Sequence, residues 1–348
     1  MPKSRKLRGA LALVLSLCPL LLKATETLGA EATPQASNQL AWTSGRHSLV
    51  IDGRERFFLL DVPRTLKPGA ALILVFHGFT GSATNIRELT GFTPLGEKYG
   101  FVVAYPEGTR DSKGRTFFQV GYDFHQDQPV DDVHFARVLS QRLVKDLSLD
   151  NRSVFSTGFS NGGDISFLLG SQPEPWVAAI APVAGTMMSK WAKDFRPATR
   201  MSVLAVNVRD DKTTLWAGDP NNRDGWGAYR GTENVLDLWV NGLALNRAVT
   251  TAVNENLQLK QWSRALDDTE VRLYELRTGD HHWPPNLGEA GLTTAGTIWR
   301  FFQKHRPAST AESTEERRSP QGPGTKVQGW LSSEDGTARL TPQPALQF

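Results

Sequence analysis

The chain has 348 residues, of which 39% are hydrophobic and 22% charged, and its formal net charge is +3. This length can bury the core of one large α/β domain or of two modest ones. Five basic residues and one acid lie within residues 1–30, so the rest of the chain carries a net charge of about −1. The basic balance of the whole chain therefore does not indicate a nucleic-acid partner.

Residues 1–30 have the order of a secretory signal. Four basic residues within the first eight positions precede an apolar run from Ala10 to Leu22, which is short for a membrane span. An uncleaved N-terminal anchor is the alternative. We expect a secreted protein, extracellular or periplasmic, without stable membrane insertion after processing. The single cysteine, Cys18, would leave with the signal, so the mature protein is expected to have no disulfide.

The expected elements then alternate between strands and helices along the chain. Two runs at 48–51 and 55–62 flank Asp52-Gly53 and predict a hairpin. Apolar runs predict buried strands at 71–76, 101–105, 177–183, 201–208 and 271–276. Helical spacing predicts helices at 86–99 (broken near Thr93-Pro94), 131–147, 162–170, 232–245 and 293–304. This alternation predicts one α/β domain over residues 37–306, with a mostly parallel central sheet and helices on both faces.

Three segments differ from this pattern. Residues 107–130 form a long loop rich in aromatic side chains, and a loop of this length is expected at the mouth of a site. Residues 212–232 form an insert that contains Trp216 and Trp226. Residues 307–348 are polar and lack periodicity, which predicts a disordered tail.

A short strand beginning at Ser153 ends in the turn Gly158-Phe-Ser160-Asn-Gly162. A strand that reverses into a helix at such a turn holds the serine in a strained backbone with its hydroxyl exposed. Ser160 is thus a candidate nucleophile, and the backbone N–H of Asn161 would face developing negative charge beside it. The alternative is an ordinary glycine turn.

The loop His77-Gly78-Phe79 follows the strand at 71–76. The N–H of Phe79 is expected to be the second oxyanion donor and to point at the same spot as that of Asn161. His77 is expected to shape this loop and to contact the substrate rather than to act as a base.

Two further polar groups follow later strands. Asp210 or Asp211 comes after the strand at 201–208, and His281 or His282 comes after the strand at 271–276. Carboxyl ends of parallel strands share one edge of a sheet, so these side chains can meet the serine there. The order serine, acid, histidine is typical of the α/β-hydrolase sheet, in which the histidine takes the serine proton and the acid orients the histidine.

A metal site at Asp280-His281-His282 is the competing interpretation. No third and fourth ligands lie nearby at metal-ligand spacing, so neither a metal nor another cofactor is expected.

Six motifs are distributed over residues 55–303: LVFHG at 74–78, GFTPLGEKYGFVVAYP at 91–106, VDDV at 130–133, TGFSNGG at 157–163, APVAG at 181–185 and GDHHWP at 279–284. Together they resemble the secreted esterase family that includes polyhydroxybutyrate depolymerases, feruloyl esterases and acetylxylan esterases of the first carbohydrate-esterase type. The resemblance implies an α/β-hydrolase fold with Ser160 as nucleophile, His281 as base and Asp211 as acid.

The sequence departs from this family in two places. Asn207-Val-Arg-Asp-Asp211 stands where the family usually has His-Gly-Thr-x-Asp, which keeps Asp210 as a rival acid. The family also often has cysteine pairs, which the mature chain would lack.

The leading hypothesis is a secreted serine esterase. It would remove feruloyl or acetyl groups from plant polysaccharide or cleave a hydroxyalkanoate oligomer, with Trp216, Trp226 and Trp283 as candidate substrate contacts. The ester substrate is the one partner expected. The alternative from another class is a non-catalytic carbohydrate-binding protein on the same fold.

Overall fold

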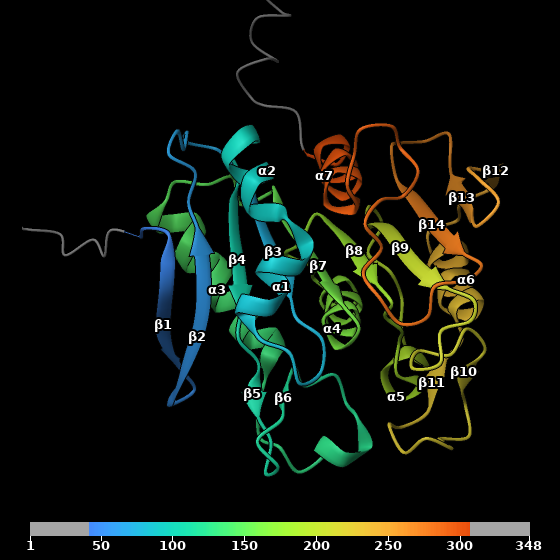
Figure 1. Cartoon of the computed structure of the whole chain (residues 1–348), viewed down its shortest axis with the longest axis horizontal. Coiled ribbons are helices and arrows are strands. Elements are labelled where there is room, and N and C mark those ends of the chain that lie inside the picture. The colour runs from blue at the N-terminus through green and yellow to red at the C-terminus, as the bar shows by residue number, and fades with distance from the viewer. Residues whose placement is uncertain (1–41, 307–348) are drawn as a thin grey trace, which may run out of the picture. The chain divides into compact units, whose positions relative to one another are not determined.

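The computed structural model describes residues 42–306, so the expected signal and tail lie outside the described residues. A ten-stranded sheet runs through this part of the chain (Figure 1). In spatial order its strands are β1 (Gly45–Ile51), β2 (Arg54–Asp61), β4 (Val102–Pro106), β3 (Leu72–Phe76), β7 (Val154–Phe159), β8 (Ala179–Val183), β9 (Ser202–Val208), β14 (Glu270–Leu276), β13 (Leu257–Ser263) and β12 (Arg247–Ala252).

The strands from β4 to β14 in this order run parallel, as the uninterrupted apolar runs predict. Antiparallel pairs extend the sheet at both ends: β1 and β2 beside β4, and β13 and β12 beside β14. Figure 1 shows these pairs at opposite ends of the sheet. The expected mostly parallel sheet of the α/β-hydrolase fold is thereby confirmed.

The helices connect the strands and cover the sheet. They are α1 (Ala83–Thr90), α2 (Phe92–Tyr99), α3 (Asp132–Asp146), α4 (Asn161–Gly170), α5 (Ser189–Ala192), α6 (Thr232–Gly242) and α7 (Thr294–Lys304), with a 3₁₀ turn η1 (Asp123–His125). Within residues 42–306, no helix is both long and apolar enough to cross a membrane.

Side chains alternate between the two faces of the sheet because successive strand residues point in opposite directions. Leu74 and Phe76 of β3 face the cluster that contains apolar residues of α3, α4 and α6. Ile73 and Val75 face a second cluster, with apolar residues of α1, α2 and α7. Helices therefore cover both faces, and the sheet is buried between two apolar cores.

The long loop and the insert each contain a short ribbon. In the loop, β5 (Thr109–Arg110) pairs with β6 (Thr116–Phe117). In the insert, β10 (Gly218–Asp219) pairs with β11 (Tyr229–Arg230). Both ribbons lie beyond the carboxyl ends of the parallel strands (Figure 1), at the edge where the candidate residues were expected.

The expected break in this helical stretch is present, but it lies two residues before Thr93-Pro94. The chain breaks at Gly91, whose φ of 71° is a left-handed conformation that glycine adopts without a steric penalty. Pro94 lies in the first turn of α2, where its missing N–H breaks no helical hydrogen bond. The residues therefore form two short helices, α1 and α2, that meet at Gly91.

Candidate active site

Ser160 lies at the junction between β7 and α4, where it is the residue before the first helical turn. Its backbone has φ 57° and ψ −120°, a conformation that residues other than glycine rarely adopt. The Ser160 N–H donates to the carbonyl of Val183 at the end of β8 (2.9 Å). The strained backbone is thus fixed between two central strands, and the serine side chain is partly exposed.

The two glycines of the turn are required by close backbone contacts. A Cβ on Gly158 would lie 2.5 Å from the carbonyl oxygen of Gly162, and one on Gly162 would lie 2.1 Å from the carbonyl oxygen of Phe76. Neither distance leaves room for a side chain. The sharp reversal from strand to helix therefore depends on glycine at both positions.

Asp211 and His281 meet although they are 70 residues apart in sequence. Asp211 Oδ2 lies 2.7 Å from His281 Nδ1, and Asp211 Oδ1 accepts hydrogen bonds from the N–H groups of Thr213 (2.7 Å) and Thr214 (2.9 Å). The carboxyl is 4% exposed. Because an ionised carboxylate only accepts, this contact favours the neutral tautomer of His281 that has its hydrogen on Nδ1 and an acceptor at Nε2.

Asp210 has a different environment. It is exposed, and its Oδ1 accepts hydrogen bonds from the N–H groups of Gly279 (3.0 Å) and Asp280 (3.2 Å). Asp280 has a positive φ of 58°. Asp210 therefore supports the backbone of the loop that carries His281, while its neighbour contacts the imidazole.

The second histidine of the pair, His282, hydrogen-bonds the carbonyl of Asp280 through Nδ1 (3.2 Å). Across residues 42–306, no group of three or more His, Cys, Asp or Glu side chains is arranged to hold a metal ion.

The ring of His281 also contacts the strand that leads to the serine. It lies 4.8 Å from the ring of Phe159, measured between centroids, and Phe159 directly precedes Ser160. Among the described residues His281 Nε2 is buried and has no hydrogen-bond partner, the serine hydroxyl included. A buried ring nitrogen without a hydrogen-bond partner costs free energy. Hydrogen bonds between a catalytic base and its nucleophile are often long without substrate and shorten when a substrate binds.

The loop that contains Phe79 touches the serine turn. A Cβ on Gly78 would lie 3.3 Å from Ser160 Cβ, so the two segments are in van der Waals contact. Neither the N–H of Phe79 nor that of Asn161 has an acceptor within the described part of the chain. The Asn161 side chain is fully buried and exchanges two hydrogen bonds with the backbone of Phe118 (2.8 and 3.0 Å).

His77 is a structural residue of this loop. Its ring is 1% exposed, accepts the N–H of Gly108 at Nε2 (2.9 Å) and lies 2.7 Å from the carbonyl oxygen of Gly78 through Nδ1. Burial lowers the pKa of His77, which favours the neutral ring that these contacts need. Both nitrogens are occupied, so the expected shaping of the loop is observed and the expected substrate contact has no group available for it.

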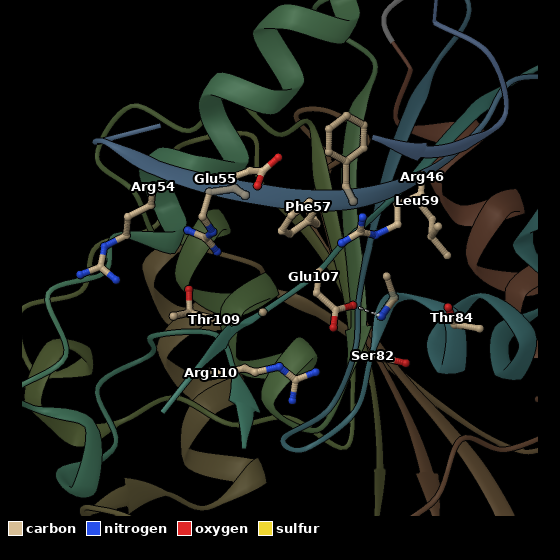
Figure 2. Close-up of a pocket in the computed structure, with 14 residues that line it drawn as sticks. Arg46, Arg54, Glu55, Phe57, Leu59, Ser82, Thr84, Glu107, Thr109 and Arg110 are labelled. Atoms are coloured by element: carbon tan, nitrogen blue, oxygen red, sulfur yellow. Dashed lines mark hydrogen bonds between the residues drawn. The ribbon is translucent and has the colours of Figure 1, made fainter. Parts of the chain in front are cut away.

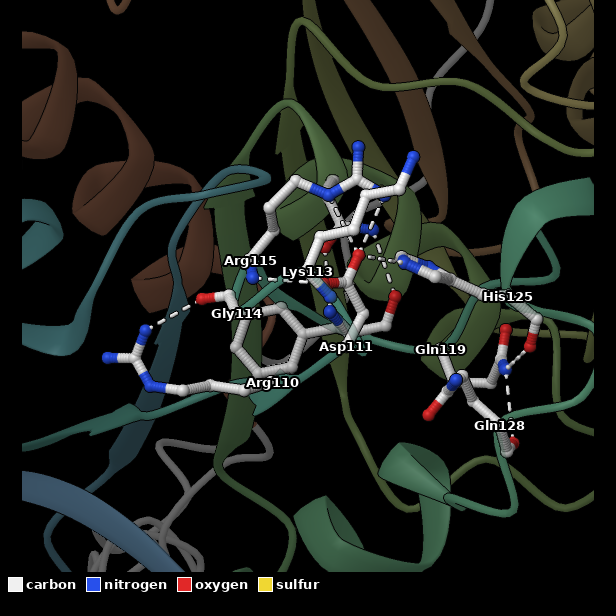
Figure 3. A network of polar contacts seen from close by, with 10 residues as sticks. Arg110, Asp111, Lys113, Gly114, Arg115, Gln119, His125 and Gln128 are labelled. Atoms are coloured by element: carbon white, nitrogen blue, oxygen red, sulfur yellow. Dashed lines mark hydrogen bonds and ion pairs between the residues drawn. The ribbon is translucent and has the colours of Figure 1, made fainter.

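The long loop between β4 and α3 is held by a polar network (Figure 3). Asp111 accepts hydrogen bonds from the N–H groups of Lys113 and Arg115 (2.9 Å each), pairs with the Arg115 guanidinium (2.7 Å) and lies 3.3 Å from His125 Nε2. Burial alone would raise the pKa of Asp111, but the Arg115 contacts hold this pKa well below its usual range. Arg115 in turn lies 5.0 Å from the centre of the Phe79 ring. The network therefore supports the ring of Phe79, in the loop that contacts the serine turn.

The three candidate tryptophans have different positions. Trp226 lines the pocket beside Ser160, and its ring lies 5.4 Å from that of Phe79. Trp216 is half-buried under the guanidinium of Arg209 (4.3 Å) and does not line this pocket. Trp283 is 8% exposed and belongs to the apolar cluster that includes α7. Of the three, only Trp226 is in a position to contact a molecule bound at Ser160.

Sequence reasoning missed Asp164, a polar residue of the same pocket, whereas Tyr122 lies in the aromatic loop that was expected at the mouth of the site. Asp164 lies one helical turn after Ser160, where an acid is usually explained by its favourable interaction with the helix dipole. Its four-residue spacing from the serine was the available signal, because residues four apart share a helix face.

A larger cleft of about 460 Å³ lies apart from the serine (Figure 2). It is bounded by β2, the start of α1 and the residues after β4, and it contains several arginines around Glu107. Glu107 accepts the N–H of Ala83 (2.7 Å). Ser160, Asp211 and His281 do not line this cleft, so it is not the candidate active site.

Comparisons with known proteins point to esterases. Over 167 residues the chain is 31% identical to "Putative esterase NocK" of Nocardia uniformis subsp. tsuyamanensis. The aligned residues make up 47% of this chain and 47% of that protein. Over 155 residues it is 27% identical to the bifunctional acetylxylan esterase/xylanase XynS20E of Neocallimastix patriciarum, covering 44% of this chain and 22% of that protein. The chain thus spans about half or less of the length of these curated relatives. No family model matches the sequence.

Among solved structures, the acetyl xylan esterase from Aspergillus awamori is similar in fold. The TM-score is 0.57 at 13% identity, covering 74% of this chain and 99% of that one. At this identity the likeness concerns the fold alone. The chain therefore has the α/β-hydrolase fold, and its curated sequence relatives are esterases of the kind that its motifs resemble.

Proposed function

We propose that the protein is a secreted carboxylic-ester hydrolase in which Ser160, His281 and Asp211 form a catalytic triad. The observation that carries the proposal is the short contact between His281 Nδ1 and Asp211 Oδ2 (2.7 Å), which leaves Nε2 as a base beside the strand that ends at the serine. The names of the sequence relatives support the same class of reaction.

The proposed chemistry has two halves. Ser160 Oγ attacks the acyl carbon while His281 Nε2 takes its proton, and the imidazolium formed is stabilised by the Asp211 carboxylate. The N–H groups of Phe79 and Asn161 would donate to the oxyanion of the tetrahedral intermediate. The leaving alcohol receives the proton from His281. Water, deprotonated by the same nitrogen, then attacks the acyl-serine. The bond between the acyl carbon and Ser160 Oγ breaks, His281 returns the proton to this oxygen, and the acid is released.

The substrate class proposed is an acyl ester of a plant polysaccharide, with an acetyl or feruloyl group, or a hydroxyalkanoate oligomer. This part rests on the motifs shared with that esterase family and on the printed name of an acetylxylan esterase relative. Secretion rests on the signal-like residues 1–30.

The test is hydrolysis of p-nitrophenyl acetate together with labelling by an active-site fluorophosphonate. Ser160→Ala is expected to lose labelling and to lower kcat by at least about 10⁴-fold, because no other hydroxyl can replace the one held at this turn. Ser112→Ala, at an exposed serine of the long loop, is the matched control and should behave as the wild type.

Unchanged hydrolysis in Ser160→Ala would contradict the proposal. A wild-type protein that is neither labelled nor active on any ester, yet binds xylan fragments, would support the carbohydrate-binding alternative.

A further inference from the structure

The pocket beside Ser160 is small, and a carboxyl group forms part of its lining. Its volume is about 30 Å³, against about 460 Å³ for the cleft around Glu107. Asp164 and Tyr122 line it together with Ser160 and Trp226. So small a space favours a short acyl group, whereas a longer chain must displace part of the wall.

The carboxyl of Asp164 is buried, and its hydrogen-bond partners are neutral. It is 4% exposed and accepts hydrogen bonds from the Tyr122 hydroxyl (2.6 Å) and the N–H of Thr186 (2.6 Å), both of which are neutral donors. No lysine or arginine of residues 42–306 forms an ion pair with it. Burial raises the pKa of Asp164 to about 7, although the Tyr122 hydroxyl, the Thr186 N–H and the charge of His281 lower it in part.

These contacts join three separate segments at the pocket. Asp164 lies in the first turn of α4, Tyr122 in the long loop, and Thr186 in the segment after β8. The ring of Tyr122 is also held 5.0 Å from that of Trp226. The wall is therefore fixed by hydrogen bonds and aromatic packing and cannot retreat without losing them.

We propose that Asp164 and Tyr122 are specificity-determining residues that limit Ser160 to short acyl groups of about two carbons. This inference rests on the proposed ester hydrolysis. A longer apolar chain would separate the carboxyl from its two donors and bring methylene groups against it, and buried polar groups left without partners are strongly unfavourable. In a fixed pocket each added methylene then changes selectivity by roughly tenfold or more.

The experiment measures kcat/KM for p-nitrophenyl acetate and p-nitrophenyl butyrate, and the readout is the ratio of the two. The wild type is expected to favour acetate by at least about 10-fold. Asp164→Ala opens space at the end of the pocket and is expected to lower the ratio about 10-fold. Asp164→Asn keeps the volume and can still bind Tyr122, whose hydroxyl then accepts from the amide, so the ratio should remain high.

Asp219→Ala is the control for the loss of a buried carboxyl. Asp219 is fully buried and accepts the N–H of Asp224 (3.0 Å), but it does not line the pocket, so its variant should keep the wild-type ratio. Where Asp164→Ala does not fold, Tyr122→Phe serves in its place. It retains the ring, removes the hydroxyl from the pocket wall and is expected to lower the ratio in the same direction.

The possible outcomes are distinct. Equal rates on acetate and butyrate in a wild-type protein that is labelled by the fluorophosphonate would overturn this inference and leave the proposed function intact. The same holds for a ratio that neither Asp164→Ala nor Tyr122→Phe changes. Absence of both labelling and hydrolysis in the wild type would overturn the proposed function and this inference with it.

Discussion

Two adjacent aspartates, Asp210 and Asp211, differ only in direction and therefore in role. Asp211 turns inward to His281 and two backbone N–H groups, and Asp210 turns to the N–H groups of the histidine loop. The residue types and the strand before them predict an acid at this edge of the sheet. They do not predict which one, because a single peptide unit decides the direction of each side chain.

Asp211→Asn is expected to lower kcat on p-nitrophenyl acetate by about 10⁴-fold, because the amide favours the wrong tautomer of His281. Asp210→Asn is the matched comparison. Its amide oxygen can still accept from Gly279 and Asp280, so kcat should fall less than about 10-fold. The reverse ranking in steady-state kinetics would make Asp210 the acid of the triad.

At the scale of single elements, two strands of the large sheet were not predicted from the sequence. They are β12 and β13, at one end of the sheet. β12 is exposed along its whole length, so it has no apolar period to detect. In β13 apolar and polar residues alternate from Leu257 to Lys260. This alternation is typical of a strand and could have predicted one in a segment where no element was expected. The central strands were predictable because both of their faces are buried and only apolar side chains fit there.

The last helix is anchored to β14 by a buried acid. Glu270 is fully buried and pairs with Arg272 (2.9 Å) and with Lys304 (3.0 Å) and His305 (3.2 Å) at the end of α7. Burial by itself would raise the pKa of Glu270, but these partners outweigh it and lower the pKa to about 2. These ion pairs therefore stabilise the fold at pH values above the pKa of Glu270 in the unfolded chain, which is near 4.3.

Glu270→Gln is expected to lower the free energy of unfolding by about 3 kcal/mol at neutral pH, as the pKa difference implies. The wild type loses this advantage as the pH falls from about 4 towards 2, since the carboxyl becomes protonated in the folded state as well. Urea titrations at pH 7 and pH 3 measure the difference. A gap between the two proteins that stays constant over this range would refute the role given to this ion pair.

At the scale of the whole described chain, two apolar cores share one sheet. Adjacent residues of β3 and of β9 point alternately into the two clusters, so neither cluster can lose its order while the strands remain intact. The alternation of strands and helices predicts such a two-sided sheet. The order β4-β3-β7 does not follow from that alternation, because it depends on which crossovers the chain takes.

Residues 42–306 are therefore expected to unfold in one cooperative step. Thermal transitions followed by far-ultraviolet circular dichroism and by tryptophan fluorescence should coincide. Ile180→Val in one cluster and Ile298→Val in the other should each cost about 1 kcal/mol and lower the same midpoint by about 2 °C. Two separate transitions, each sensitive to one variant, would show independent cores.

The backbone angles of Ser160 restrict how this turn can evolve. A β-branched side chain is strongly disfavoured at a φ of 57°, so threonine would bring a hydroxyl to this position only with a distorted turn. Cysteine has no branch at Cβ and fits the same backbone. Cysteine could therefore replace Ser160 without a change in the turn, whereas threonine could not.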